Sequence, residues 1–154
     1  MKEEIIFNQS ETVRSITVEL LESIPESDWD VIPKGFRNNI RWNAGHILTI
    51  QDWFANSFRS LSENLPNKYW DYFAKDTSPA DWTDDPPSKE VLLKLLKEQH
   101  VWIHTTCKGK LDQKLDEPFK GMETLGELLL LGNFHDGMHN GVINAQKKII
   151  IANK

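Results

Sequence analysis

The last third of the chain contains a run of residues that are spaced alternately by three and by four. This run passes through Leu125, Leu128, Gly132, His135, His139, Val142, Gln146 and Ile149 without a change of phase. Such spacing is typical of a helix face that packs against other helices. Thr124 and Glu127 have the spacing of a capping box, so we expect the helix to begin between them. The rest of the chain must supply the helices that cover this face.

Three earlier segments, at about 3–24, 39–62 and 88–108, also repeat apolar residues at helical spacing. Pro25 ends the first segment, Ser88 is suited to cap the third, and Gly109 follows it. The sequence has little strand signal, no internal repeat and no glycine-rich phosphate loop. We therefore predict an all-α fold, a single four-helix-bundle domain over residues 1–154, with the helices in up-down-up-down order.

The connection over residues 63–87 is long, non-periodic and unusually rich in aromatic residues. Loops of this length inside a compact domain are usually functional or partly helical. Its aromatic residues suit a cover that packs onto the bundle. They are Tyr69, Trp70, Tyr72, Phe73 and Trp82.

Gly132, Gly137 and Gly141 interrupt the helical pattern of the last segment. Each glycine costs about 1 kcal/mol relative to alanine inside a helix. One alternative is a helical hairpin that turns at Asp136-Gly137 and Asn140-Gly141. Because the spacing keeps its phase through both dipeptides, we predict a continuous helix, with small residues where another backbone or subunit approaches closely.

Composition excludes several classes of protein. The longest apolar run, residues 128–131, is too short to span a membrane, and a net charge of −5 argues against binding nucleic acid. The N-terminus has acidic residues where a secretory signal would be basic, and a single cysteine, Cys107, excludes an intrachain disulfide. We expect a cytoplasmic protein in which Cys107 is an inert buried thiol.

Three histidines are candidate metal ligands. His135 and His139 lie one turn apart on the same face of the predicted last helix, and His46 lies on the apolar side of the second. Neutral imidazoles are good ligands for Zn, Ni, Fe or Cu, and three of them leave one coordination position for water or substrate. The alternative is that these histidines are hydrogen-bonded core residues.

Several other residues are candidates for the same site. Trp42 and Trp53 flank His46 in sequence and are candidate pocket walls, while Asn43 is placed to orient a ligand or to cap the helix. His100 and His104 form a second pair four apart; we interpret His100 as a packed or pocket-lining residue and His104 as near the surface. No single general base stands out, because helical phase turns Asp136 about 100° away from His135.

Two stretches resemble the signature regions of the DinB/YfiT-like superfamily: residues 39–48, NIRWNAGHIL, and residues 124–141, TLGELLLLGNFHDGMHNG. The resemblance covers essentially the whole chain in helix order. It implies a metal-binding four-helix bundle of bacterial type in which His46, His135 and His139 hold a divalent metal. Many relatives have glutamine at the position that Val142 occupies here, so a role for that glutamine does not transfer.

The resemblance implies an enzyme that acts on a small molecule. Relatives include S-transferases that use bacillithiol or mycothiol, and metal-dependent hydrolases. Zn or Ni is the favoured metal, with Fe or Mn as alternatives, and a low-molecular-weight thiol is a candidate co-substrate. Relatives often form homodimers, and the glycines of the last helix permit close packing of a second subunit without requiring it. The alternative function is a non-catalytic bundle in which the metal is structural, with His100 as a fourth ligand, or in which a ligand is sensed.

Overall fold

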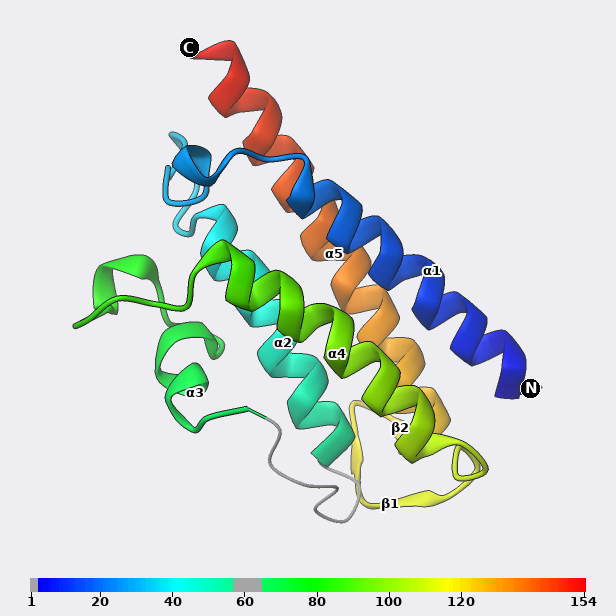
Figure 1. Cartoon of the computed structure of the whole chain (residues 1–154). Coiled ribbons are helices and arrows are strands. Elements are labelled where there is room, and N and C mark those ends of the chain that lie inside the picture. Colours follow the sequence, from blue (N-terminus) through cyan, green and yellow to red (C-terminus); the bar gives the residue numbers. More distant parts are fainter. Residues whose placement is uncertain (1–2, 57–64) are drawn as a thin grey trace.

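The computed structural model describes residues 3–56 and 65–154. Four long helices form the bundle, as the sequence predicts: α1 (Glu3–Glu22), α2 (Ile40–Asn56), α4 (Lys89–Cys107) and α5 (Leu125–Ala152) (Figure 1). Short elements occupy the connections: a helix α3 (Lys68–Phe73), 3-10 turns at Glu26–Asp28 and Pro79–Asp81, and the strands β1 (Lys114–Phe119) and β2 (Met122–Thr124). None of the described helices is both long and apolar enough to cross a membrane.

The order of the helices differs from the prediction. α1 and α5 run parallel, because hydrogen bonds between them join residues in the same sequence order on both helices. The bonded pairs are Gln9–Asn133, Arg14–Asp136 and Thr17–Asn140. α2 and α4 also run parallel, with bonds in the pairs Arg41–Pro87 and Leu48–Gln99. The order is therefore up-down-down-up, and Figure 1 shows both parallel pairs. The long connection after α2 brings the chain back to the end where α2 began, which an antiparallel order would not need.

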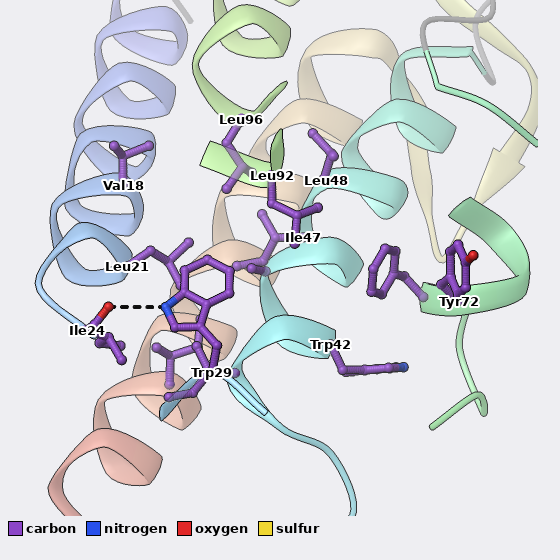
Figure 2. Packing of buried hydrophobic residues seen from close by; sticks show 14 of the residues in the cluster. Val18, Leu21, Ile24, Trp29, Trp42, Ile47, Leu48, Tyr72, Leu92 and Leu96 are labelled. Atoms are coloured by element: carbon purple, nitrogen blue, oxygen red, sulfur yellow. Dashed lines mark hydrogen bonds between the residues drawn. The ribbon is translucent and has the colours of Figure 1, made fainter. Parts of the chain in front are cut away.

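One apolar cluster fills the end of the bundle where α2 and α4 begin. Trp29 lies at its centre, fully buried, and its indole Nε1 donates to the Ile24 carbonyl at 3.3 Å (Figure 2). Around it lie buried residues from α1, α2 and α4, among them Val18, Leu21, Ile47, Leu48, Leu92 and Leu96. Satisfying the indole N–H inside the core avoids the cost of an unpaired buried donor.

The described part of the long connection, residues 65–87, packs onto α2 as predicted. Tyr69, Tyr72 and Phe73 of α3 are buried, while Trp70 is 40% exposed. Phe73 lies directly on Gly45 of α2, where an added Cβ would meet the phenyl ring at 2.5 Å. The glycine therefore allows α3 to dock closely. The predicted end of the second helix, at residue 62, lies outside the described residues.

α5 is a continuous helix, and Thr124 and Glu127 form the predicted capping box. Within this chain, the expected close approach occurs at one of its three glycines. Gly132 lies against the side chain of Gln51, but an added Cβ at Gly137 or Gly141 would meet nothing within 4 Å. Gly137 and Gly141 lie on the exposed side of α5, so their effect is a loss of helix propensity without a packing gain inside the described chain.

The β-hairpin before α5 is not among the elements predicted from the sequence. Leu115 is the only buried residue of β1 and β2, so the strands lack the alternating apolar pattern that identifies a half-buried strand. At the hairpin tip, Lys120 and Gly121 both adopt positive φ, 50° and 83°. Two positive φ values in succession give a tight turn with the twist that hairpins favour.

Candidate metal centre

The three candidate histidines come together between α2 and α5. His46 projects from α2, and His135 and His139 project from successive turns of α5. One potential ligand atom from each lies within 4.8 Å of the others. The ring centroids are 4.5 to 5.1 Å apart. His46 is buried and the other two are half-buried, so the cluster has one side open toward solvent.

Hydrogen bonds set the orientation of two of these rings. Nδ1 of His46 lies 2.6 Å from the carbonyl oxygen of Phe73, and Nδ1 of His139 lies 2.8 Å from Oδ1 of Asn43. Both partners are acceptors, so each Nδ1 carries the proton and donates. The Nε2 atom of each ring is then left with a free lone pair, which is the atom a metal would bind.

His135 has an incomplete version of the same arrangement. Its Nδ1 is buried with no hydrogen-bond partner among the described residues, and so is Oδ1 of Asp136. The two atoms are 3.7 Å apart, just beyond hydrogen-bond length. A small movement of the ring would pair them and give the third histidine a carboxylate acceptor.

Asp136 was expected to point away from the helix interface, and this expectation is wrong. It is 2% exposed, and its Oδ2 accepts a hydrogen bond from Arg14 of α1 at 3.2 Å. Arg14 also donates to Oε1 of Gln99 on α4, and Gln99 donates to the Leu48 carbonyl of α2. α5 packs against both α1 and α2, so its buried arc is wider than one heptad face, and Asp136 lies on the α1 side of that arc.

Asn43 is held by its own network. Its Nδ2 donates to the Asn39 carbonyl and to Oε1 of Gln146, while Nε2 of Gln146 donates to the Asn38 carbonyl. The amide oxygen of Asn43 is therefore fixed toward His139. Capping of α2 is done by Asn39, whose Oδ1 accepts from the Trp42 backbone N–H. Of the two roles considered for Asn43, the structure favours orientation of a histidine.

Burial keeps two of the three imidazoles neutral. Desolvation lowers the pKa of His46 to about 4, against a smaller opposing effect of its bond to Phe73. Desolvation, with help from the neighbouring His135 and His46, lowers the pKa of His139 to about 3. Both imidazoles are therefore unprotonated at neutral pH and do not need to lose a proton before they bind a cation.

The donor set fits a divalent transition metal. With Zn–N bonds of about 2.0–2.1 Å, tetrahedral ligand nitrogens lie about 3.3 Å apart, so the cluster would need to contract by an ångström or so. The same inward movement is available to His135, because its Nδ1 has no hydrogen-bond partner among the described residues. Three imidazole nitrogens, each with an acceptor at or near its other ring nitrogen, form a recognisable metal-binding arrangement.

Tryptophans border the cluster. Trp42 stacks on His46 with ring centroids 4.5 Å apart and an angle of 14° between the planes, and its Nε1 donates to Thr77. Trp53 lies further along α2, and its ring contacts the rings of Phe54 and Phe119. Trp42 thus supports the His46 ring, and Trp53 belongs to the wall of the adjacent cavity.

A cavity of about 620 Å³ opens beside the cluster. His46 and His135 form part of its lining, together with Ile50, Trp53, Phe54, Trp70, Lys75, Phe119, Lys120, Leu131, Phe134 and Met138. Among these, only Trp53 and the two histidines are site candidates predicted from the sequence. The others come from α2, from α3 and the loop after it, from the hairpin and from α5, and no local pattern in the sequence indicates that these segments meet.

His100 is half-buried and packed, the first of its two interpretations, and does not line the cavity. It is absent from the cavity lining and from the histidine cluster, and its pKa is lowered by burial and by nearby Arg14, which places it toward α1. His104 also faces α1, with its ring 4.4 Å from that of Phe7. Cys107 is fully buried, and desolvation raises its pKa to about 11, which agrees with an inert thiol.

The family is decided by a sequence comparison. The sequence model of the DinB superfamily matches residues 9–143. The chain belongs to the DinB superfamily. Its fold is similar to that of a conserved protein from Enterococcus faecalis, known from a crystal structure, with a TM-score of 0.72 and 15% sequence identity over 99% of each chain. No curated protein matches the sequence. Membership in this superfamily and the three-histidine cluster together support metal binding.

Proposed function

We propose that this protein is a divalent-metal-dependent enzyme that acts on a small molecule beside His46, His135 and His139. The observation that carries the proposal is the arrangement of Nδ1 atoms. Two of the three are bound to acceptors at 2.6 and 2.8 Å, and the third faces a carboxylate oxygen at 3.7 Å. Such acceptors fix the tautomer and direction of metal-binding imidazoles. Zn or Ni is the favoured ion, and Fe or Mn are alternatives.

Transfer of a low-molecular-weight thiol to an electrophile is the favoured reaction. In this reaction the thiol loses its proton to solvent, its sulfur bonds to the electrophilic carbon, and the leaving group departs with the bonding electron pair. A divalent cation at the three histidines would supply the positive charge that lowers the pKa of the thiol. The residues of this chain would orient the reactants and exclude water from the apolar cavity.

The lack of a general base supports thiol transfer over hydrolysis. Among the described residues, no aspartate or glutamate lines the cavity. Asp52, whose pKa burial raises to about 6, is hydrogen-bonded to Asn56 and lies outside the lining. Nδ1 of His46 and of His139 already donate to fixed acceptors. A thiol that ionises under the influence of a cation would not need a protein base, whereas activation of water and protonation of an amine leaving group usually use one.

The test combines metal analysis with two assays. Protein purified without chelator is analysed for metal, then assayed for consumption of bacillithiol with monochlorobimane and for hydrolysis of p-nitrophenyl acetate. We expect about one ion per chain and thiol consumption that chelator abolishes. Metal-dependent ester hydrolysis without thiol consumption would replace the transferase by a hydrolase. Bound metal with neither activity would contradict an enzyme and favour a non-catalytic binding bundle.

A further inference from the structure

The cavity beside the histidines has a charge opposite to that of the whole protein. The chain has a net charge of −5. The charged residues among the described cavity lining are Lys75 and Lys120, both positive. A cation bound by the histidines would make the cavity still more positive. The field inside it therefore favours an anionic occupant.

The cavity walls are mainly apolar and include several aromatic rings. The ring of Phe119 meets Trp53 edge-on, with centroids 4.9 Å apart, and lies 5.8 Å from Phe54. At the mouth, large apolar side chains remain in contact with water: Phe134 is 63% exposed and Met138 49%. Exposed apolar residues gathered around a cavity mark a binding surface more often than isolated ones do. These walls suit a ring or a branched hydrocarbon.

The two lysines come from separate loops at the cavity mouth. Lys75 follows α3, and its side chain is 86% exposed with only a distant partner, Asp76 at 4.0 Å. Lys120 sits at the hairpin tip in a left-handed conformation, with its Nζ 5.6 Å from the Phe119 ring centroid. Neither ammonium is neutralised by a close carboxylate in the described structure. Both are free to meet an anion whose apolar part lies deeper.

We propose that the cavity takes a small amphiphilic anion, with an aromatic or branched apolar body against Trp53 and Phe119 and a carboxylate or sulfonate toward Lys75 and Lys120. This proposal rests on the proposed function, since such an anion would be the electrophilic substrate that reacts beside His46 and His135. The volume of about 620 Å³ is within the usual range for small-molecule sites. A binding experiment tests the proposal without any assay of activity.

Two fluorescent probes that differ in one charge provide the test. 8-Anilino-1-naphthalenesulfonate and the neutral N-phenyl-1-naphthylamine have the same apolar body. We expect the sulfonate to bind about five-fold more tightly to the native protein, as two exposed charge pairs allow, and this preference to shrink at high salt. The double variant Lys75→Gln/Lys120→Gln should lose the preference and keep its affinity for the neutral probe. The variant Phe134→Glu places a negative charge at an exposed position of the cavity lining and should reverse the preference, so that the neutral probe binds more tightly.

The double variant Lys94→Gln/Lys148→Gln is the matched control, because it removes two charges from exposed positions outside the cavity. It should retain the preference. Equal affinity of the native protein for both probes, or an unchanged preference in the Lys75/Lys120 variant, would overturn the proposal. Helix content by circular dichroism shows that each variant is folded.

His135→Ala separates this proposal from the proposed function. The variant should lose its metal and keep its preference for the sulfonate, because the lysines recognise the anion. Loss of the preference in His135→Ala, with retention in the Lys75/Lys120 variant, would assign the anion to the metal and overturn the role of the lysines. If the native protein contains no metal but prefers the sulfonate, the enzyme proposal fails and the anion site stands.

Discussion

Asn43 on α2 fixes the direction of His139 on α5: its Oδ1 accepts a hydrogen bond from Nδ1 of the imidazole at 2.8 Å. Gln146 and the Asn39 carbonyl hold the Asn43 amide in place through its Nδ2. The helix pair that carries the histidines thus also carries the groups that aim them. A metal site built this way depends on residues that never touch the metal.

Replacement of Asn43 by alanine should weaken metal binding by about 10- to 100-fold, the usual cost of removing a hydrogen-bond partner of a metal-binding histidine. The His139 ring would keep its place on α5 and lose its fixed tautomer. Competition titration with a chromophoric chelator measures the change. Asn133→Ala is the control, because Asn133 is also buried but bonds Gln9 of α1. Equal loss of affinity in both variants would rule out a specific role for Asn43.

Gly45→Ala should destabilise the protein and weaken metal binding together. The new methyl group would meet the Phe73 ring at 2.5 Å, so α3 must shift, and the Phe73 carbonyl that orients His46 must shift with it. Overpacking of this kind costs about 1–3 kcal/mol, against a gain of about 1 kcal/mol in helix propensity. Urea unfolding and chelator competition measure both effects.

Gly141→Ala is the matched control for that experiment. It also lies in a long helix, but its Cβ would enter open space. We expect it to stabilise the protein by up to about 1 kcal/mol and to leave metal affinity unchanged. Should Gly45→Ala behave like Gly141→Ala, the close docking of α3 on α2 would be incorrect.

The buried ion pair between Arg14 and Asp136 should be costly to break on one side. Both side chains are less than 10% exposed, and Arg14→Met would leave the carboxylate of Asp136 without its charged partner. Such a change typically costs about 3–5 kcal/mol. Adding Asp136→Asn should recover part of this loss, because a neutral amide needs no counter-charge. The urea midpoints of the single and double variants measure this recovery. A double variant that is less stable than Arg14→Met would contradict the prediction.

The metal-free protein should lose stability as the pH falls from about 6.5 toward 4. The pKa values of His46 and His139 are lowered to about 4 and 3 in the folded state, so below pH 6.5 the unfolded chain binds protons that the folded chain does not. Asp52 has the opposite effect. Burial raises its pKa to about 6, so its burial destabilises the folded protein least at low pH, where the carboxyl group is protonated. The Asp52→Asn variant should therefore lose stability more steeply than the native protein as the pH falls.

Urea unfolding in the presence of chelator at pH 7, 6 and 5 measures this dependence. The native protein should show a shallow decline, because the histidines and Asp52 partly cancel below pH 6. Asp52→Asn should show the full effect of the histidines. Identical midpoints for this variant at pH 7 and pH 5 would mean that the histidines are not desolvated in the folded protein.

The sequence predicts the four helices and the three histidines because both follow from local periodicity. Heptad spacing places His135 and His139 on one face, and the apolar side of the second segment includes His46. The direction of the helices does not follow from periodicity. It depends on where the connection over residues 63–87 leads the chain, and a helix pattern reads the same whichever way its neighbour runs. This is why the order was predicted as alternating and is instead up-down-down-up.

The residues that surround the histidines were harder to predict for physical reasons. The acceptor of His46 is a backbone carbonyl at the end of α3, and every residue has such a carbonyl. Asp136 is buried because α5 packs on two helices at once, which widens its buried arc beyond the seam that carries His135. Lys75 and Lys120 reach the cavity through two loops far apart in sequence. Tertiary packing alone brings these groups together.

The most direct test is the metal content of the native protein and of His135→Ala, with His104→Ala as a control histidine that faces Phe7 on α1. All three proteins are purified without chelator and analysed by mass spectrometry of the metal, with helix content measured by circular dichroism. The three-histidine centre predicts about one ion per chain in the native protein and in His104→Ala, and almost none in a folded His135→Ala. Unchanged metal content in His135→Ala would contradict it.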